Sequence, residues 1–156
     1  MKFGGTLIAV RNMERSKRFY CDLMGMTVTE DFGANVTLSG SLFLQTMESW
    51  KDFIHKEQSS IILGNNATEL YFEEDDMDSF LERLEATHTI RYVHPVKEHS
   101  WGQRAVRFYD PDYHIIEVGE NMKAVVRRFL AGGMTVEQAA VRMDVSEDYI
   151  RRCMEP

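Results

Sequence analysis

The stretch that decides the fold is residues 107–118, which read Arg-Phe-Tyr-Asp-Pro-Asp-Tyr-His-Ile-Ile-Glu-Val. Its centre, Asp110-Pro111-Asp112, is typical of a tight turn, because proline pre-sets φ and aspartate side chains bond nearby backbone amides. The apolar residues on either side predict two strands, over residues 103–109 and 113–119. We therefore expect a hairpin whose turn fixes the strand register, and a structural rather than catalytic role for Asp110 and Asp112.

The same order of elements is predicted twice along the chain. In the second half, strand 69–73 precedes a helix that Asp76 caps, and strand 89–93 leads to the hairpin. In the first half, the predicted elements are strand 6–10, a helix capped by Asn12 and ended by Gly25, and strands 26–31, 35–38 and 41–46. The two helix starts lie 64 positions apart, so the repeat is one of element order. Residues 48–58 are predicted to form a helix or ordered linker between the halves.

The composition narrows the function classes. The chain has 156 residues and a formal net charge of −7, and such an acidic chain is poorly suited to binding nucleic acid. Its sequence contains neither an apolar run of membrane-spanning length nor a secretory leader pattern. Cys21 and Cys153 form no Cys-x-x-Cys pair and are expected to be free thiols. We expect a cytoplasmic protein without a membrane partner.

Residues 121–156 differ in character and predict three short helices, with Asn121, Thr135 and Ser146 as their caps. The second and third helices are similar to a helix-turn-helix. However, Glu147 and Asp148 would lie next to phosphates, and the segment holds six basic against five acidic residues. We expect a helical extension that caps the domain or a dimer partner, and no nucleic-acid binding.

Three motifs resemble the vicinal oxygen chelate superfamily, which includes glyoxalases, bleomycin-resistance proteins and extradiol dioxygenases. They are residues 19–26 (Phe-Tyr-Cys-Asp-Leu-Met-Gly-Met), 101–104 (Trp-Gly-Gln-Arg) and the hairpin 107–118, in which Tyr113 replaces the family's usual glycine. The resemblance implies an α+β fold of two βαβββ modules, about 3–48 and 67–120. Residues 1–120 would form the glyoxalase/bleomycin-resistance-like domain, with residues 121–156 as the extension, and the chain would form a homodimer.

The resemblance also implies where a divalent cation would bind in members that use one. The family's ligand positions fall on Gly5, Gln45, Glu69 and Glu117. Gly5 cannot bind a metal, which leaves one amide and two carboxylates, and such oxygen donors favour Mg²⁺ or Mn²⁺ over Zn²⁺. We expect no cofactor; the alternative is a divalent cation (Mg, Mn, Fe, Ni or Zn) acting as a Lewis acid. Without metal, Glu69 or Glu117 could act as a general base.

Aromatic and cationic side chains complete the candidate site. The candidates for ligand binding are Gln45, Tyr71, Trp101, Arg107 and Tyr109. His94 and His99 are expected in a loop, because Pro95 argues against a helix. The function expected is metal-free binding of a small molecule. The alternative is a metal-dependent lyase, isomerase or dioxygenase acting on vicinal oxygens, and the sequence leaves open whether the protein is an enzyme.

Overall fold

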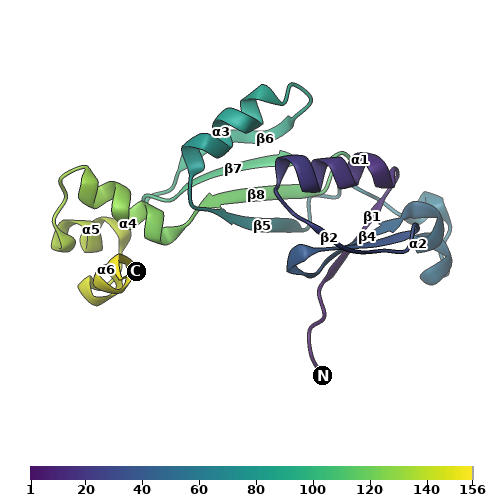
Figure 1. Ribbon diagram of the computed structural model, residues 1–156, viewed down its shortest axis with the longest axis horizontal. Coiled ribbons are helices and arrows are strands. Elements are labelled where there is room, and N and C mark those ends of the chain that lie inside the picture. Colours follow the sequence, from purple (N-terminus) through teal and green to yellow (C-terminus); the bar gives the residue numbers. More distant parts are fainter. Residues whose placement is uncertain (156) are drawn as a thin grey trace. The chain divides into compact units, whose positions relative to one another are not determined.

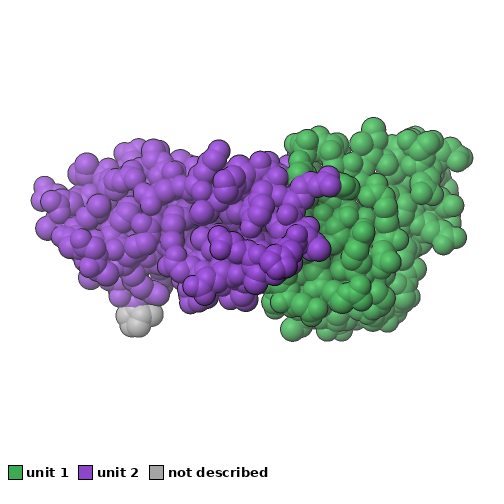
Figure 2. Space-filling model, turned by 90° about the horizontal axis from the view of Figure 1, so that it is seen from above, with its two compact units in different colours: residues 1–68, 109–114 green, residues 69–108, 115–156 purple. Residues whose placement is uncertain are grey.

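The computed structural model describes residues 1–155 and contains two four-stranded mixed sheets with helices, which confirms the expected α+β class (Figure 1). The chain divides into two compact units, coloured separately in Figure 2. The first unit contains residues 1–68 and 109–114, and the second contains residues 69–108 and those from 115 onward. The turn of the hairpin therefore belongs to the first unit, while most of its strands belong to the second.

The first unit follows the predicted order. Its elements are β1 (Thr6–Val10), α1 (Met13–Arg18) with a π-helical continuation (Phe19–Leu23), β2 (Val28–Asp31), β3 (Asn35–Leu38), β4 (Leu42–Thr46) and α2 (Met47–Phe53), with 3-10 turns at Ser39–Ser41 and Gln58–Ser60. The strand order is β1-β4-β3-β2, with β1 parallel to β4 and the other pairs antiparallel. Asn12 caps α1 as predicted, by accepting from the Arg15 backbone N–H.

One face of the first sheet forms a core with α1. Val10, Val36 and Leu44 are fully buried, as is Tyr20 of the π-helical turn. On β3, Val36 lies between the more polar and more exposed Asn35 and Thr37, as expected of a sheet that buries one face against a helix. Helix α2 follows β4 directly and packs against it, so the predicted linker between the halves begins as a helix.

The second unit repeats the arrangement. It contains β5 (Glu69–Glu74), α3 (Met77–Ala86), β6 (Arg91–Glu98), β7 (Arg104–Tyr109) and β8 (Ile115–Glu120), in the sheet order β5-β8-β7-β6. β5 is parallel to β8, as β1 is to β4. Asp76 caps α3 through the Ser79 backbone N–H. The buried Phe80 of α3 packs on Phe108 of β7 with ring centroids 6.3 Å apart, so α3 covers that face of the sheet.

The prediction for β6 was wrong in one respect. The strand was expected over residues 89–93, with His94 in a loop, but β6 extends from Arg91 to Glu98 and includes His94. Pro95 does not end the strand, because β6 lies at the edge of its sheet, where a residue without an N–H is tolerated. His94 is thereby placed on the sheet.

The three predicted C-terminal helices are present as α4 (Met122–Ala131), α5 (Val136–Met143) and α6 (Glu147–Met154). Asn121, Thr135 and Ser146 cap them, and Thr135 forms the predicted capping box with Gln138. The helices share a small core of their own, built from Val125, Val126, Phe129, Ala139, Ala140, Met143, Ile150 and Cys153. The separation of residues 121–156 from a domain of residues 1–120 stays a prediction.

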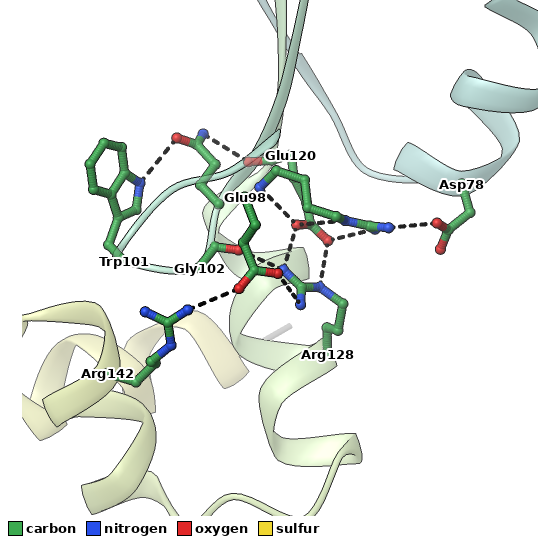
Figure 3. A network of polar contacts seen from close by, with 9 residues as sticks. Asp78, Glu98, Trp101, Gly102, Glu120, Arg128 and Arg142 are labelled. Atoms are coloured by element: carbon green, nitrogen blue, oxygen red, sulfur yellow. Dashed lines mark hydrogen bonds and ion pairs between the residues drawn. The ribbon is translucent and has the colours of Figure 1, made fainter. Parts of the chain in front are cut away.

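A buried carboxylate joins these helices to the second sheet (Figure 3). Glu120, at the end of β8, accepts hydrogen bonds from Arg104 of β7 and Arg128 of α4. Arg128 also donates to the Gly102 carbonyl oxygen at 2.6 Å, and both Arg128 and Arg142 pair with Glu98. Each charge in this network faces an opposite one, as buried or half-buried charges require.

Candidate functional site

The hairpin turn is built by two buried carboxylates. Asp110 accepts from the Tyr20 hydroxyl and from the backbone N–H groups of Asp112 and His114, each at 2.8 Å. Asp112 is fully buried and lies 3.2 Å from the Arg15 guanidinium and 3.3 Å from the Ser16 hydroxyl. The Asp110 carboxylate bonds the turn and Tyr20 of the π-helical continuation, and the Asp112 carboxylate bonds α1, which explains why the turn belongs to the first unit. Tyr113 adopts φ of 72°, the left-handed conformation that glycine favours.

The two faces of the second sheet differ in chemistry. Successive strand residues point to opposite faces, so Phe108, which packs on α3, and its neighbour Arg107 lie on different sides. On β8, Glu117 lies between the buried Ile116 and Val118. Strand β5 pairs Tyr71 with Glu117, and Glu69 lies two residues before Tyr71. We name the face opposite α3, which carries Glu69, Tyr71, His94, Arg107 and Glu117, the polar face.

A guanidinium lies at the centre of the polar face. Arg107 donates from Nε to Glu69 Oε2 at 2.9 Å and from Nη2 to Glu117 Oε2. Its Nη1 lies 3.3 Å from His94 Nε2. Three side chains from three strands thus contact the three nitrogens of one guanidinium. We name Arg107, Glu69, Glu117 and His94 the Arg107 cluster.

The two carboxyl groups of the cluster titrate differently. The hydrogen bond from Arg107 lowers the pKa of Glu69. Burial raises the pKa of Glu117 and outweighs the attraction of Arg107, and the neighbouring Glu69 raises it further. The cause is position, because Glu117 is only 7% exposed in the middle of β8, whereas Glu69 begins an edge strand. A pair with separated pKa values contains one carboxylate held charged and one closer to accepting a proton.

A second set of polar contacts extends along the same face. Gln103 donates to the Tyr71 hydroxyl at 3.3 Å and to the Glu120 carbonyl oxygen at 3.0 Å, and accepts from the Trp101 indole at 3.2 Å. A Cβ at Gly119 would lie 3.0 Å from Gln103 Nε2 and 3.1 Å from Tyr71, so the absence of a side chain there admits both. Tyr71 remains 50% exposed, and Trp101, stacked on His99, 40%. These rings can contact a ligand.

Two predicted ligand-binding residues belong to the first unit. Gln45 is 1% exposed; its amide oxygen accepts from Asn35 and its amide nitrogen donates to Ser49. Both ends of this amide are therefore engaged within the unit. Tyr109 donates to Asn66 at 2.8 Å and packs edge-on to Tyr113. The structure thus brings Glu69, Tyr71, Arg107 and Glu117 together in the second unit. Gln103 links this set to Trp101. Gln45 and Tyr109 lie in the first unit and have their hydrogen-bond partners there.

The residues at the family's metal positions do not fit a cation as they stand. Within residues 1–155, no three His, Cys, Asp or Glu side chains are grouped so that they could hold a metal ion. Glu69 and Glu117 both direct an oxygen at the Arg107 guanidinium, whose positive charge they already share. Gly5 supplies no donor, and Gln45 is engaged with Asn35 and Ser49.

Two βαβββ modules in one chain are the fold expected from the family resemblance, and comparison with known proteins gives the same family. The model of the glyoxalase-like domain family matches residues 3–123. The chain belongs to this glyoxalase-like family, which confirms the family resemblance found in its sequence. No match was found among curated proteins.

Solved structures show the same fold. The chain is 36% identical to a protein of unknown function from Agrobacterium tumefaciens, with a TM-score of 0.68, covering 78% of this chain and 94% of that one. It is 18% identical to a glyoxalase/bleomycin resistance protein/dioxygenase from Nocardioides, with a TM-score of 0.61 and coverage of 77% and 83%. A lactoylglutathione lyase from Agrobacterium tumefaciens is 22% identical, with a TM-score of 0.56 and coverage of 78% and 94%.

Three residues of the polar face were missed in the sequence. His94 was placed in a loop because of Pro95, and its position on an edge strand could have been foreseen only from the strand order. Gln103 precedes β7 and follows no periodic pattern. Gly119 lies inside β8, and a glycine inside a strand often marks a close approach of other groups. That signal was present in the sequence.

Proposed function

We propose that the chain binds a small molecule on the polar face of its second sheet, and that it does so without a metal. The observation that carries the proposal is the Arg107 cluster, in which a guanidinium is held by two carboxylates beside the half-exposed Tyr71. Groups oriented by their neighbours lose little freedom when a ligand binds, which favours affinity. A few oriented polar groups beside aromatic surface are typical of ligand sites.

The charges and rings of the polar face favour a planar ligand with a positive group. Two carboxylates and one guanidinium give the Arg107 cluster a net negative charge when His94 is neutral. Tyr71 and Trp101 offer exposed ring surface, which attracts cations and stacks on planar groups. Aromatic amines combine both properties.

A binding experiment tests the proposal. Aromatic amines, with aromatic carboxylates of similar size for comparison, are screened by thermal shift, and the strongest binder is titrated by calorimetry. Tyr71→Ala and Glu69→Gln are expected to weaken binding by about tenfold each. Phe53→Ala removes an aromatic ring that is 67% exposed on α2 of the first unit and is expected to leave affinity unchanged. Unchanged affinity in the Tyr71 and Glu69 variants would rule out the polar face as the site.

A second candidate function is acid–base catalysis, and the raised pKa of Glu117 favours it. A buried carboxyl with a raised pKa is a stronger base than an exposed one, and can remove a proton beside a carbonyl group. One structural relative is a lactoylglutathione lyase. Turnover of α-hydroxycarbonyl or hemithioacetal substrates by metal-stripped protein, lost in Glu117→Gln while the variant remains folded, would support this role.

The metal-dependent lyase, isomerase or dioxygenase inferred as an alternative from the sequence is tested separately. Elemental analysis of the purified protein decides it, since a stoichiometric divalent cation that is lost in Glu69→Gln and Glu117→Gln would favour that alternative over metal-free binding.

We also infer a homodimer, because the family resemblance implies that subunits share the walls of the binding site. A cytoplasmic location is a separate part of this proposal. The described chain contains no helix with the length and apolar character needed to cross a bilayer. Light scattering coupled to gel filtration tests the dimer, and a stable monomer at micromolar concentration would contradict it.

A further inference from the structure

We propose that helices α4 and α5 are part of the small-molecule site, because three of their residues hold the loop that presents Trp101 to a ligand. The loop is residues 99–103, His-Ser-Trp-Gly-Gln, which we name the Trp101 loop. The inference rests on the proposed function and adds Arg128, Phe129 and Arg142 to it as positioning residues, which act on the ligand through the loop.

The Trp101 loop is a tight turn between β6 and β7. The His99 backbone N–H donates to the Gln103 carbonyl oxygen at 2.8 Å, and the Gly102 N–H donates to the His99 carbonyl oxygen at 2.9 Å. Gly102 adopts φ of 92°, a conformation that other residues rarely adopt. The His99 ring stacks on the Trp101 indole, with ring centroids 4.3 Å apart and an angle of 5° between the planes. One face of the indole is therefore covered by His99, and the ring is still 40% exposed.

Two arginines of the C-terminal helices hold the backbone of this loop. Arg128 of α4 donates to the Gly102 carbonyl oxygen at 2.6 Å (Figure 3), and Arg142 of α5 donates to the Ser100 carbonyl oxygen. Both arginines also pair with Glu98, the last residue of β6 before the loop. The carbonyl groups on either side of Trp101 are thus fixed, which restricts the backbone rotations that would move the indole.

Phe129 of α4 supplies the surface on which the loop packs. A Cβ at Gly102 would lie 2.1 Å from the Phe129 ring, so the loop backbone approaches this ring as closely as a glycine allows. Phe129 is 6% exposed and belongs to the core that the three C-terminal helices share. The guanidinium groups of Arg128 and Arg142 lie over the same ring, 5.0 and 5.9 Å from its centroid. The loop is therefore anchored to a core that lies beyond residue 123, where the match to the family ends.

Gln103 connects the anchored loop to the polar face. Its amide accepts from the Trp101 indole and donates to the Tyr71 hydroxyl, so the two exposed rings proposed to contact the ligand are joined through one side chain. A loop that is ordered before binding spares the complex the entropic cost of ordering it. A ligand with a planar ring would therefore meet the free face of Trp101 already in place, and its affinity would depend on the contacts made by α4 and α5.

A double-mutant cycle in the 156-residue chain tests the inference by calorimetric titration. The ligand is the aromatic amine of the screen that binds most strongly, with tryptamine as the first probe. Arg142→Ala is expected to weaken binding by about tenfold when Trp101 is present, and by less than about twofold in a Trp101→Ala background, because Arg142 acts through Trp101. Arg142→Lys keeps a donor for the Ser100 carbonyl oxygen and is expected to restore most of the affinity.

Two control variants distinguish this role from general stability. Thr135→Ala removes the hydroxyl that caps α5, and Arg127→Ala removes a positive charge from an exposed position on α4. Both variants are expected to leave the affinity for the amine unchanged. In the absence of ligand, Arg142→Ala should increase the quenching of Trp101 fluorescence by acrylamide, recorded in a Trp50→Phe background, whereas the two controls should not.

Two results would overturn the inference. One is wild-type affinity in the Arg142→Ala variant, and the other is an equal loss of affinity with and without Trp101. Either result, together with weakened binding in Tyr71→Ala, would leave the proposed function standing. Unchanged affinity in both Tyr71→Ala and Glu69→Gln would instead remove the polar face as the site, and the inference with it. Wild-type protein that binds no aromatic amine would overturn the inference and the proposed function together.

Discussion

Arg128 of α4 donates two hydrogen bonds to the Glu120 carboxylate, from Nε to Oε1 at 3.1 Å and from Nη2 to Oε2 at 2.9 Å. The carboxylate is almost fully buried, and Arg104 also donates to both of its oxygens. Together with the pairs that Arg128 and Arg142 form with Glu98 of β6, this pairing links the C-terminal helices to the second sheet by charge. It is also continuous with the polar face, because Gln103 bonds both the Glu120 backbone and Tyr71.

Replacing the carboxylate at this point should destabilise the fold strongly. Glu120→Gln removes the buried negative charge between two half-buried arginines, which then keep only the exposed acidic partners Asp78 and Glu98. Breaking a buried ion pair on one side costs about 3 kcal/mol of unfolding free energy. Urea denaturation followed by circular dichroism measures the loss. Glu147→Gln, which removes a carboxylate from the exposed Glu147–Arg151 pair, is the control and should cost less than about 1 kcal/mol.

The same residue should contribute to the pH dependence of stability. Burial raises the pKa of Glu120, but the hydrogen bonds from Arg128 and Arg104 outweigh burial and hold it below its usual value. The stabilisation is therefore complete above the unfolded-state value near 4.5 and is lost as the pH falls through the lower folded-state value. The stability difference between wild type and Glu120→Gln should be larger at pH 7 than at pH 3. A difference that grows toward acid would contradict the assignment.

The hydrogen bond under the hairpin turn gives a second stability prediction. Tyr20 is fully buried, and its hydroxyl donates to Asp110 at 2.8 Å. Tyr20→Phe should cost about 2 kcal/mol, because it removes a donor from a buried carboxylate. Tyr92→Phe removes a hydroxyl from a side chain that is 40% exposed and should stay within about 0.5 kcal/mol of wild type. Equal effects of the two substitutions in thermal denaturation would argue against a special role for Tyr20.

Gly119→Ala should disturb the polar face without unfolding the sheet. The added Cβ would meet Gln103 at 3.0 Å and Tyr71 at 3.1 Å, so both side chains must shift. Gln103 accepts from the Trp101 indole, and the emission of Trp101, recorded in a Trp50→Phe background, should therefore change. Gly4→Ala, where a Cβ meets nothing within 4 Å, should leave the emission unchanged. An unaltered emission spectrum in Gly119→Ala would contradict the prediction, because it would show that Gln103 and Tyr71 accommodate the added Cβ without disturbing Trp101.

The capping box of α5 predicts a smaller effect. The Thr135 hydroxyl accepts from the Gln138 backbone N–H at 3.1 Å, and the Gln138 side chain accepts from the Thr135 N–H at 2.9 Å. Thr135→Ala should lower the free energy of unfolding by about 1 kcal/mol, whereas Thr135→Ser, which keeps the hydroxyl, should lower it much less. Urea denaturation of the Thr135→Ala and Thr135→Ser variants distinguishes the effect of losing the capping hydroxyl from the effect of losing the methyl group.

Much of the fold could be predicted from local patterns, because capping residues in the sequence mark where its helices begin. Asn12, Asp76 and Thr135 each precede a helix and cap it in the structure. An apolar, β-branched run predicted β1, and alternation predicted β3, both with their observed bounds. β6 was placed too early because a proline tolerated on an edge strand looks the same in sequence as one that ends a strand.

The candidate site was harder to predict from the sequence, because strand pairing decides which of its residues come into contact. Glu117 stood out as a carboxylate within an apolar strand, and family position pointed to Glu69. That Arg107 would contact both depends on which strands are neighbours and in which register. The engagement of Gln45 with Asn35 and Ser49 likewise depends on β3, β4 and α2 packing together, which no single stretch of sequence encodes.

The discontinuous first unit has a consequence for biosynthesis. Its first 68 residues emerge from the ribosome well before Asp110 and Asp112, which supply the carboxylates for Tyr20, Arg15 and Ser16. A nascent chain that ends before residue 110 contains every residue of α1 and the first sheet, yet its Tyr20 hydroxyl lacks the Asp110 acceptor it has in the finished protein. Translation must therefore pass the turn before this half of the molecule can reach its full stability, and a fragment that stops at residue 68 should be vulnerable to proteases.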